Sequence, residues 1–119
     1  MNVEDFRIYC LAKKYVTESF PFDNETLVFK VANKMFALLS LEKIPPTANL
    51  KCDPERAIEL RDRYPEIVPG YHMNKRLWNT VEIDSGLDND FVREMIDDSY
   101  NLIVQSLPKK LQQELGFID

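Results

Sequence analysis

Three short segments of alternating apolar and polar residues follow one another in the first half of the chain. They cover Thr26–Val31, Met35–Leu41 and Thr47–Cys52. Alternation with a period of two is typical of β-strands. The links between these segments are far shorter than the crossover of about a dozen residues that parallel strands need. We therefore predict an antiparallel meander, with Asn33-Lys34 as a tight turn because Asn tolerates a positive φ.

The same alternation predicts which side chains share a face of the sheet. In Met35–Leu41 the odd-numbered residues are expected together on one apolar face. In Thr47–Cys52 the even-numbered residues are apolar, which leaves Asn49 and Lys51 on the polar face together with Thr47. Lys30 of the first strand is a candidate to join this polar face.

Helices are predicted before, between and after the strands. Asp53-Pro54 is a strong helix start, because Asp is a good N-cap and Pro suits the first helical position. The predicted helices cover about Asn2–Lys14, Asp53–Tyr64, Asp88–Leu107 and Pro108–Leu115. Further extended segments are predicted at Tyr15–Phe20, Ile67–Tyr71 and Leu77–Ile83. The strands come in runs, so we predict an α+β fold: an antiparallel sheet of about six strands packed against helices, in the order helix, strands, helix, strands, helix.

Length and hydropathy indicate a single domain over residues 1–119. The longest apolar run, Met35–Leu39, is far shorter than the roughly 18 residues that a membrane span needs. The first residues, Met1–Asp5, contain neither the basic nor the apolar region of a signal peptide. We therefore expect a cytoplasmic protein without membrane contact.

Charge is unevenly distributed along a chain whose formal net charge is −5. Lys43–Arg76 holds seven basic and five acidic residues, whereas Val81–Leu107 holds one basic and seven acidic residues. The acidity is thus expected on the long late helix, and the middle of the chain is mildly basic. Glu94, Asp97 and Asp98 of that helix do not converge on one point, so we expect them to face water rather than bind a cation.

Signatures of catalysis and of cofactor binding are absent from the sequence. Cys10 and Cys52 are isolated and lie on apolar phases of their elements, which predicts buried structural thiols. With His72 as the one histidine and three scattered glycines, the chain lacks a histidine-based metal site and a phosphate-binding loop. We therefore assign no catalytic residue, metal or cofactor, and expect a protein that is not an enzyme.

The segment Gly70–Val81 concentrates aromatic, cationic and amide side chains, and two interpretations are open. Lys75 and Arg76 beside Trp78 suit contacts to phosphates and stacking on bases. Alternatively, Trp78 fills the interior while the polar side chains hold a turn, and residue chemistry alone favours this structural interpretation. Likewise, the face expected to carry Lys51 and Trp78 is either a mildly basic binding surface or a solvated or covered sheet face.

The same segment, Gly70-Tyr71-His72-Met73-Asn74-Lys75-Arg76-Leu77-Trp78-Asn79-Thr80-Val81, resembles the hallmark of the YjbR/MmcQ-like proteins, a family of small bacterial proteins. Val3–Lys14, Leu50–Glu55 and Ser99–Lys109 agree with the family pattern as well, so the resemblance covers nearly the whole chain. The resemblance implies the double-wing fold, also described as CyaY-like, of a phage transcription factor's C-terminal domain. It also implies a DNA-binding role.

On this resemblance DNA is the expected partner, bound by a locally basic sheet surface while the acidic last helix faces away. The expected nucleic-acid-binding residues are Lys51, His72, Asn74, Lys75, Arg76 and Trp78. The alternative is an adaptor that binds a protein or a small ligand, which the acidic net charge favours. An enzyme with an unrecognised site is the third hypothesis. We expect a monomer or a weak homodimer.

Overall fold

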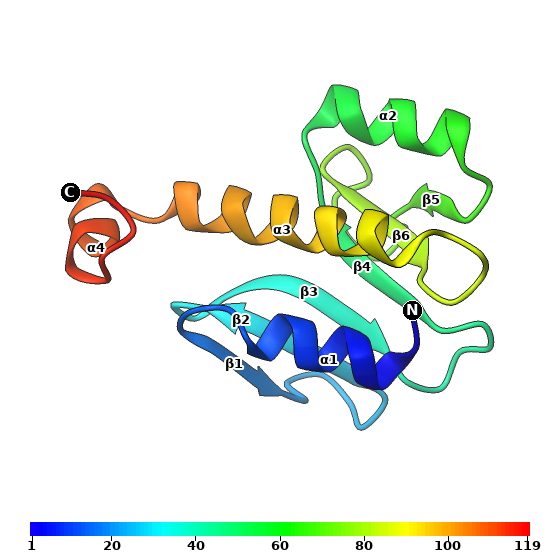
Figure 1. Ribbon diagram of the computed structural model, residues 1–119, viewed down its shortest axis with the longest axis horizontal. Coiled ribbons are helices and arrows are strands. Elements are labelled where there is room, and N and C mark those ends of the chain that lie inside the picture. Colours follow the sequence, from blue (N-terminus) through cyan, green and yellow to red (C-terminus); the bar gives the residue numbers. More distant parts are fainter.

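A six-stranded antiparallel sheet forms the centre of the computed structural model, which describes residues 1–119 (Figure 1). The strands are arranged in the order β1-β2-β3-β4-β6-β5. Their bounds are β1 Val16–Ser19, β2 Thr26–Val31, β3 Lys34–Ser40, β4 Thr47–Lys51, β5 Ile67–Pro69 and β6 Trp78–Glu82. The first four strands follow the chain order and every neighbouring pair is antiparallel, which confirms the α+β class and the predicted meander.

Four helices accompany the sheet, and their bounds are α1 Val3–Leu11, α2 Pro54–Arg63, α3 Asn89–Ser106 and α4 Lys109–Glu114. Helices α1 and α3 lie against the sheet, and α2 packs beside β5 and β6 (Figure 1). The predicted cap of α2 is confirmed, since the Asp53 carboxylate accepts a hydrogen bond from the Arg56 backbone N–H at 3.3 Å. No helix is both long and apolar enough to span a lipid bilayer.

Helix α1 ends earlier than predicted because the chain turns sharply before β1. The helix stops at Leu11, the Lys13 N–H donates to the Cys10 carbonyl three residues back at 3.2 Å, and Tyr15 adopts a φ of 62° that turns the chain into β1. The carbonyl oxygen of Lys14 accepts a hydrogen bond from the Tyr100 hydroxyl at 2.6 Å. Residues 12–15 are therefore a turn anchored to α3, and the predicted end at Lys14 is wrong by three residues.

The main core lies between the sheet and helices α1 and α3. The aromatic rings of Phe6, Phe29 and Phe36 follow one another there, and the ring of Phe36 meets that of Tyr100 with 5.2 Å between their centres. Ser99 of α3 is fully buried, and its hydroxyl donates to the Phe36 carbonyl at 2.5 Å and accepts from the Lys51 N–H at 2.9 Å. One side chain of α3 thereby fixes the helix to β3 and β4.

The acidic face of α3 is not wholly solvated. Asp97 accepts a hydrogen bond from the Tyr9 hydroxyl at 2.7 Å and pairs with the Lys13 ammonium at 2.5 Å. These contacts join α1 to α3, so the expectation that Asp97 simply faces water is wrong. Desolvation, followed by the nearby charges of Glu94 and Asp97, raises the pKa of Asp98.

A β-bulge corrects the predicted face of Met35. The register shifts between Phe29 and Lys30 and sets Lys30 opposite Met35. Met35 therefore packs on the side of the sheet away from the helices, whereas Phe36 and Ala37 both enter the main core. The turn that joins these strands lies one residue earlier than predicted: Ala32 and Asn33 have φ values of 49° and 68°.

Candidate functional site: the uncovered face of the sheet

The face of the sheet opposite α1 and α3, here named the uncovered face, carries the residues on which a binding function depends. In the β4–β6 ladder Lys51 is opposite Trp78, Asn49 is opposite Thr80 and Thr47 is opposite Glu82. Directly opposed residues of antiparallel strands share a face. These pairs therefore lie on one face, which confirms the predicted polar face of β4.

A small apolar cluster occupies the middle of the uncovered face. Val28, Leu38 and Trp78 form it, and Met35, Met73 and Leu77 pack against it. Residues 70–77 thus cover part of the sheet where no helix does. The backbone of this loop returns onto Trp78, whose carbonyl accepts a hydrogen bond from the Gly70 N–H at 2.8 Å.

One end of the sheet, here named the basic end, carries five cations. Lys30, Lys34 and Lys51 line a hollow of about 580 Å³, which Ile103 and Ser106 of α3 line as well, so it lies at the end of the sheet and not wholly on the uncovered face. Lys75 and Arg76 precede Trp78, the ladder partner of Lys51, so they lie at the same end of the sheet. None of the five takes part in an ion pair.

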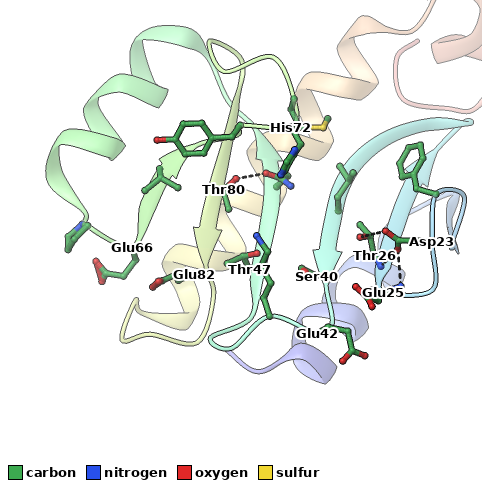
Figure 2. Close-up of a pocket in the computed structure, with 18 residues that line it drawn as sticks. Asp23, Glu25, Thr26, Ser40, Glu42, Thr47, Glu66, His72, Thr80 and Glu82 are labelled. Carbon is green, nitrogen blue, oxygen red and sulfur yellow. Dashed lines mark hydrogen bonds between the residues drawn. The ribbon is translucent and has the colours of Figure 1, made fainter.

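The other end is hollowed into a groove of about 760 Å³ that extends from β2 across β3, β4 and β6 to β5 (Figure 2). Phe22 stands on one side, and Tyr71, His72 and Met73 stand on the other. The groove is lined by the carboxylates of Asp23, Glu25, Glu42, Glu66 and Glu82. We name it the acidic groove, because Lys43 is the one lysine or arginine that lines it.

Hydrogen bonds order parts of the acidic groove. The Thr80 hydroxyl donates to the Asn49 side-chain oxygen at 2.6 Å on the floor. At the β2 end, the Asp23 carboxylate accepts from the backbone N–H groups of Glu25 at 2.9 Å and Thr26 at 2.7 Å. These bonds favour the ionised form and lower the pKa of Asp23.

The expected cations Lys51, Lys75 and Arg76 lie at the basic end with different exposures. Lys51 is half-buried, whereas Lys75 and Arg76 are exposed. The Lys75 ammonium lies 5.1 Å from the centre of the Tyr71 ring, and the Lys75 carbonyl accepts from Arg61 at 3.0 Å. The fold therefore brings these three cations to one end of the sheet.

The expected residues Trp78, Asn74 and His72 take three other roles. Trp78 is 8 % exposed in the apolar cluster, so its ring is not an open stacking platform. Asn74 holds a turn, since its side-chain oxygen accepts from the Arg76 N–H and its carbonyl accepts from the Leu77 and Trp78 N–H groups. His72 is exposed and lines the acidic groove, apart from the hollow of Lys30, Lys34 and Lys51.

Cys10, Cys52 and His72 do not form a thiol–imidazole pair. Both cysteines are buried in the main core, and desolvation raises the pKa of Cys10 to about 12 and that of Cys52 to about 11. His72 lies across the sheet, on the uncovered face. No three acidic, histidine or cysteine side chains are grouped so that they could hold a metal ion.

The acidic groove was not predicted from the sequence. Glu82 falls on the same strand phase as Trp78 and Thr80, so the alternation predicts the face of the sheet on which it lies. Asp23, Glu25 and Glu42 lie in links outside the strands, and Glu66 precedes the edge strand β5. The structure corrects the predicted mildly basic surface, because the basic character holds at one end only.

These features define a small α+β protein with one helix-covered sheet face, one uncovered face and opposite charges at the two ends of the sheet. The chain belongs to the YjbR family, whose model matches residues 11–102. It is 39 % identical over 101 residues to the uncharacterised protein YbdF of Escherichia coli O157:H7, an alignment that covers 85 % of this chain and 83 % of YbdF. It is 30 % identical over 115 residues to the uncharacterised protein YjbR of Escherichia coli K12, with 97 % and 98 % covered.

Solved structures agree with this assignment. The Deinococcus radiodurans protein DR2400 matches with a TM-score of 0.91 and 40 % identity, over 97 % of this chain and 88 % of that protein. A Pseudomonas syringae protein matches with a TM-score of 0.75 and 32 % identity, over 86 % of this chain and 98 % of its own. The family resemblance carried by the segment Gly70–Val81 is thereby confirmed.

Proposed function

We propose that this chain is a non-enzymatic binding protein that contacts the phosphates of DNA through the basic end of its sheet. The observation that carries this proposal is the gathering of five cations without an ion-pair partner at one end of the sheet, namely Lys30, Lys34, Lys51, Lys75 and Arg76. Each lysine or arginine that neutralises a phosphate releases a counterion, which favours binding.

The charges at the two ends of the sheet determine how DNA would lie. The acidic groove repels phosphates, so the duplex would contact the basic end rather than cross the whole face. Because Trp78 is buried, base stacking would contribute little, and we expect binding that depends weakly on sequence. DNA binding also implies a cytoplasmic location, which is part of this proposal.

The absence of catalysis is the second part of the proposal. The high pKa values of Cys10 and Cys52 disfavour the nucleophilic thiolate. His72 forms no hydrogen bond with a nucleophile or a carboxylate, which disfavours a role as a general base.

Titration of the full chain with labelled duplex and single-stranded DNA at several salt concentrations tests the proposal. With five contacts at most, the slope of log K against log salt is expected to reach no more than about −4.5 for duplex DNA. Neutralising Lys51 and Lys75 together to Gln should make that slope shallower by about two units. Absence of binding at low salt and protein concentrations up to about 100 µM would refute the proposal.

The matched control neutralises two exposed cations elsewhere, Lys14→Gln with Arg63→Gln. It changes the net charge by the same amount and leaves the basic end intact. If the control weakens DNA binding as much as the Lys51 and Lys75 pair does, the attraction is a property of net charge and the basic end is not the site.

A second candidate function, a protein-interaction adaptor, is favoured by a different observation. Five carboxylates line the acidic groove, and none of them forms an ion pair. With one lysine among five carboxylates, this groove disfavours a phosphate and suits a cationic ligand.

A further inference from the structure

We propose that the acidic groove binds an extended, lysine- and arginine-rich segment of a partner protein. Phe22 is the one residue that lines both the groove and the hollow of Lys30, Lys34 and Lys51, and all five carboxylates line the groove alone. Peptide binding in the groove therefore does not depend on DNA binding, and different charge variants test the two proposals.

The dimensions of the groove suit a short extended chain. It spans the strands from β2 to β5, which are four inter-strand spacings apart, or about 19 Å in all. An extended peptide advances about 3.3 Å per residue, so about six residues match that length. A volume of about 760 Å³ is in the range of ligand sites rather than of packing defects.

The carboxylates are distributed along the groove and do not converge. Asp23 and Glu25 lie at the β2 end, Glu42 lies in the link after β3, and Glu82 and Glu66 lie on the β6 and β5 side (Figure 2). A hard metal ion needs several oxygens at one point, and no such group exists here. The spacing instead complements a ligand whose positive charges are themselves spread along its length.

Two exposed aromatic side chains flank the carboxylates. Phe22 is 64 % exposed and Tyr71 is 62 % exposed, and they line opposite sides of the groove. Lysine and arginine bury their aliphatic stems against apolar surface, and their cationic heads are attracted to aromatic faces. Aromatic side chains beside carboxylates therefore favour basic side chains over a simple cation, which has no aliphatic stem to bury.

The floor adds neutral hydrogen-bonding groups. Ser40, Thr47 and Thr80 contribute hydroxyls, and Asn49 contributes an amide. The groove crosses the strands, so a peptide in it lies across the ladder and does not add a strand to an edge. Recognition would thus rest on side chains and on hydrogen bonds to the floor.

The experiment uses the full chain and a fluorescein-labelled peptide in which lysine and arginine alternate with serine. The matched probe replaces the basic residues with glutamate. Fluorescence anisotropy at low salt is expected to show binding of the basic peptide and none of the acidic one. The triple variant Glu42→Gln, Glu66→Gln and Glu82→Gln should lower the affinity about tenfold or more.

The control variant neutralises three exposed carboxylates outside the groove, Glu55→Gln, Asp62→Asn and Glu114→Gln. Its net charge equals that of the groove triple, and it should bind the basic peptide nearly as well as the wild type. If circular dichroism shows that the groove triple folds poorly, Phe22→Ala with Tyr71→Ala provides a charge-neutral test. This double variant should also lower the affinity for the basic peptide.

Four results would overturn the inference. The groove triple and the control could lose peptide affinity equally, or the basic and acidic peptides could bind equally well. The basic peptide could fail to bind at protein concentrations up to about 100 µM. Finally, the protein could form a homodimer that the groove triple dissociates. The last result would assign the face to a second copy of this chain. If the groove triple loses affinity for the basic peptide but binds DNA as well as or better than the wild type, this inference is separated from the proposed function.

Discussion

The basic end and the acidic groove lie at opposite ends of one sheet and carry opposite charges. The basic end presents cations around a hollow, whereas the groove presents carboxylates between aromatic walls. The buried cluster of Val28, Leu38 and Trp78 lies on the uncovered face. A net charge of −5 describes neither end, so charge arguments about binding have to be made region by region.

The largest effect is expected from removing the side chain that supports both ends. Trp78 underlies the loop that carries Tyr71 and His72 to the groove and Lys75 to the basic end. Because the Trp78 ring is buried, Trp78→Ala should lower the free energy of unfolding by about 3 kcal/mol, as measured by urea denaturation. It should also weaken ligand binding at both ends.

The exposed Phe22 provides the control for Trp78. Phe22→Ala should change the free energy of unfolding by no more than about 0.5 kcal/mol. If Trp78→Ala changed the free energy of unfolding as little as Phe22→Ala, the Trp78 side chain would not stabilise the fold. The structural interpretation of Trp78 would then fail, and a binding role would be favoured.

The next largest effect concerns the path of the loop over Trp78. A Cβ added at Gly70 would lie 3.0 Å from the Trp78 carbonyl oxygen and 3.1 Å from the Trp78 Cβ. Gly70→Ala should therefore destabilise the fold by about 1–2 kcal/mol, measured by the same denaturation. Gly86→Ala is a useful comparison, because its strain would come from a φ of 101° and not from crowding.

Hydrogen exchange distinguishes the two glycines. Gly70→Ala should increase exchange at the amides of residues 70–78, whereas Gly86→Ala should leave that segment unchanged. An unchanged loop in Gly70→Ala would show that the Trp78 contact relaxes freely and does not set the path of residues 70–77.

Much of the fold was predictable from local patterns. The alternation in β4 and β6 placed Lys51 and Trp78 on one face, and Asp53-Pro54 marked the start of α2. Those features depend on residues close together in the chain, so periodicity and capping reveal them. Met35 was misassigned because a bulge reverses the phase of a strand without leaving a clear signal in its residues.

Local sequence patterns do not predict the acidic groove, and the reason differs from that for Met35. Glu25 and Glu66 are far apart in sequence and meet one groove only because β6 pairs with both β4 and β5. That strand order is a long-range property of the sheet. The basic end was partly foreseen, since Lys51, Lys75 and Arg76 were identified, while Lys34 joins them only through the position of the β2–β3 turn.

A charge reversal in the groove should remove the contrast between the two ends. Glu66→Lys with Glu82→Lys places two cations where phosphates are now repelled. We expect DNA affinity at low salt to rise about tenfold and basic-peptide binding to be lost. Lys substitutions at Glu55 and Glu114, which are exposed and outside the groove, should raise DNA affinity less. Equal gains in both variants would mean that DNA does not distinguish the uncovered face from the rest of the surface.

The smallest effect is expected from the loop that carries Phe22. The Asp23 carboxylate accepts two backbone hydrogen bonds that shape this loop. These hydrogen bonds lower the pKa of Asp23. Asp23→Ala should weaken basic-peptide binding about threefold, because the loop loses both bonds and the groove loses a charge. Asp23→Asn keeps an acceptor oxygen and should recover part of that loss.

The pH dependence of the Asp23 contribution has a definite sign. A carboxyl group whose pKa is lowered by folding contributes stability above its unfolded pKa of about 3.9 and loses it as the pH falls through the lower folded value. NMR titration of the Glu25 and Thr26 amides in the wild type should therefore show their hydrogen bonds weakening only below about pH 4. Weakening at higher pH would show that Asp23 does not hold the loop, and the Phe22 side of the groove would then have to be ordered by the bound partner instead.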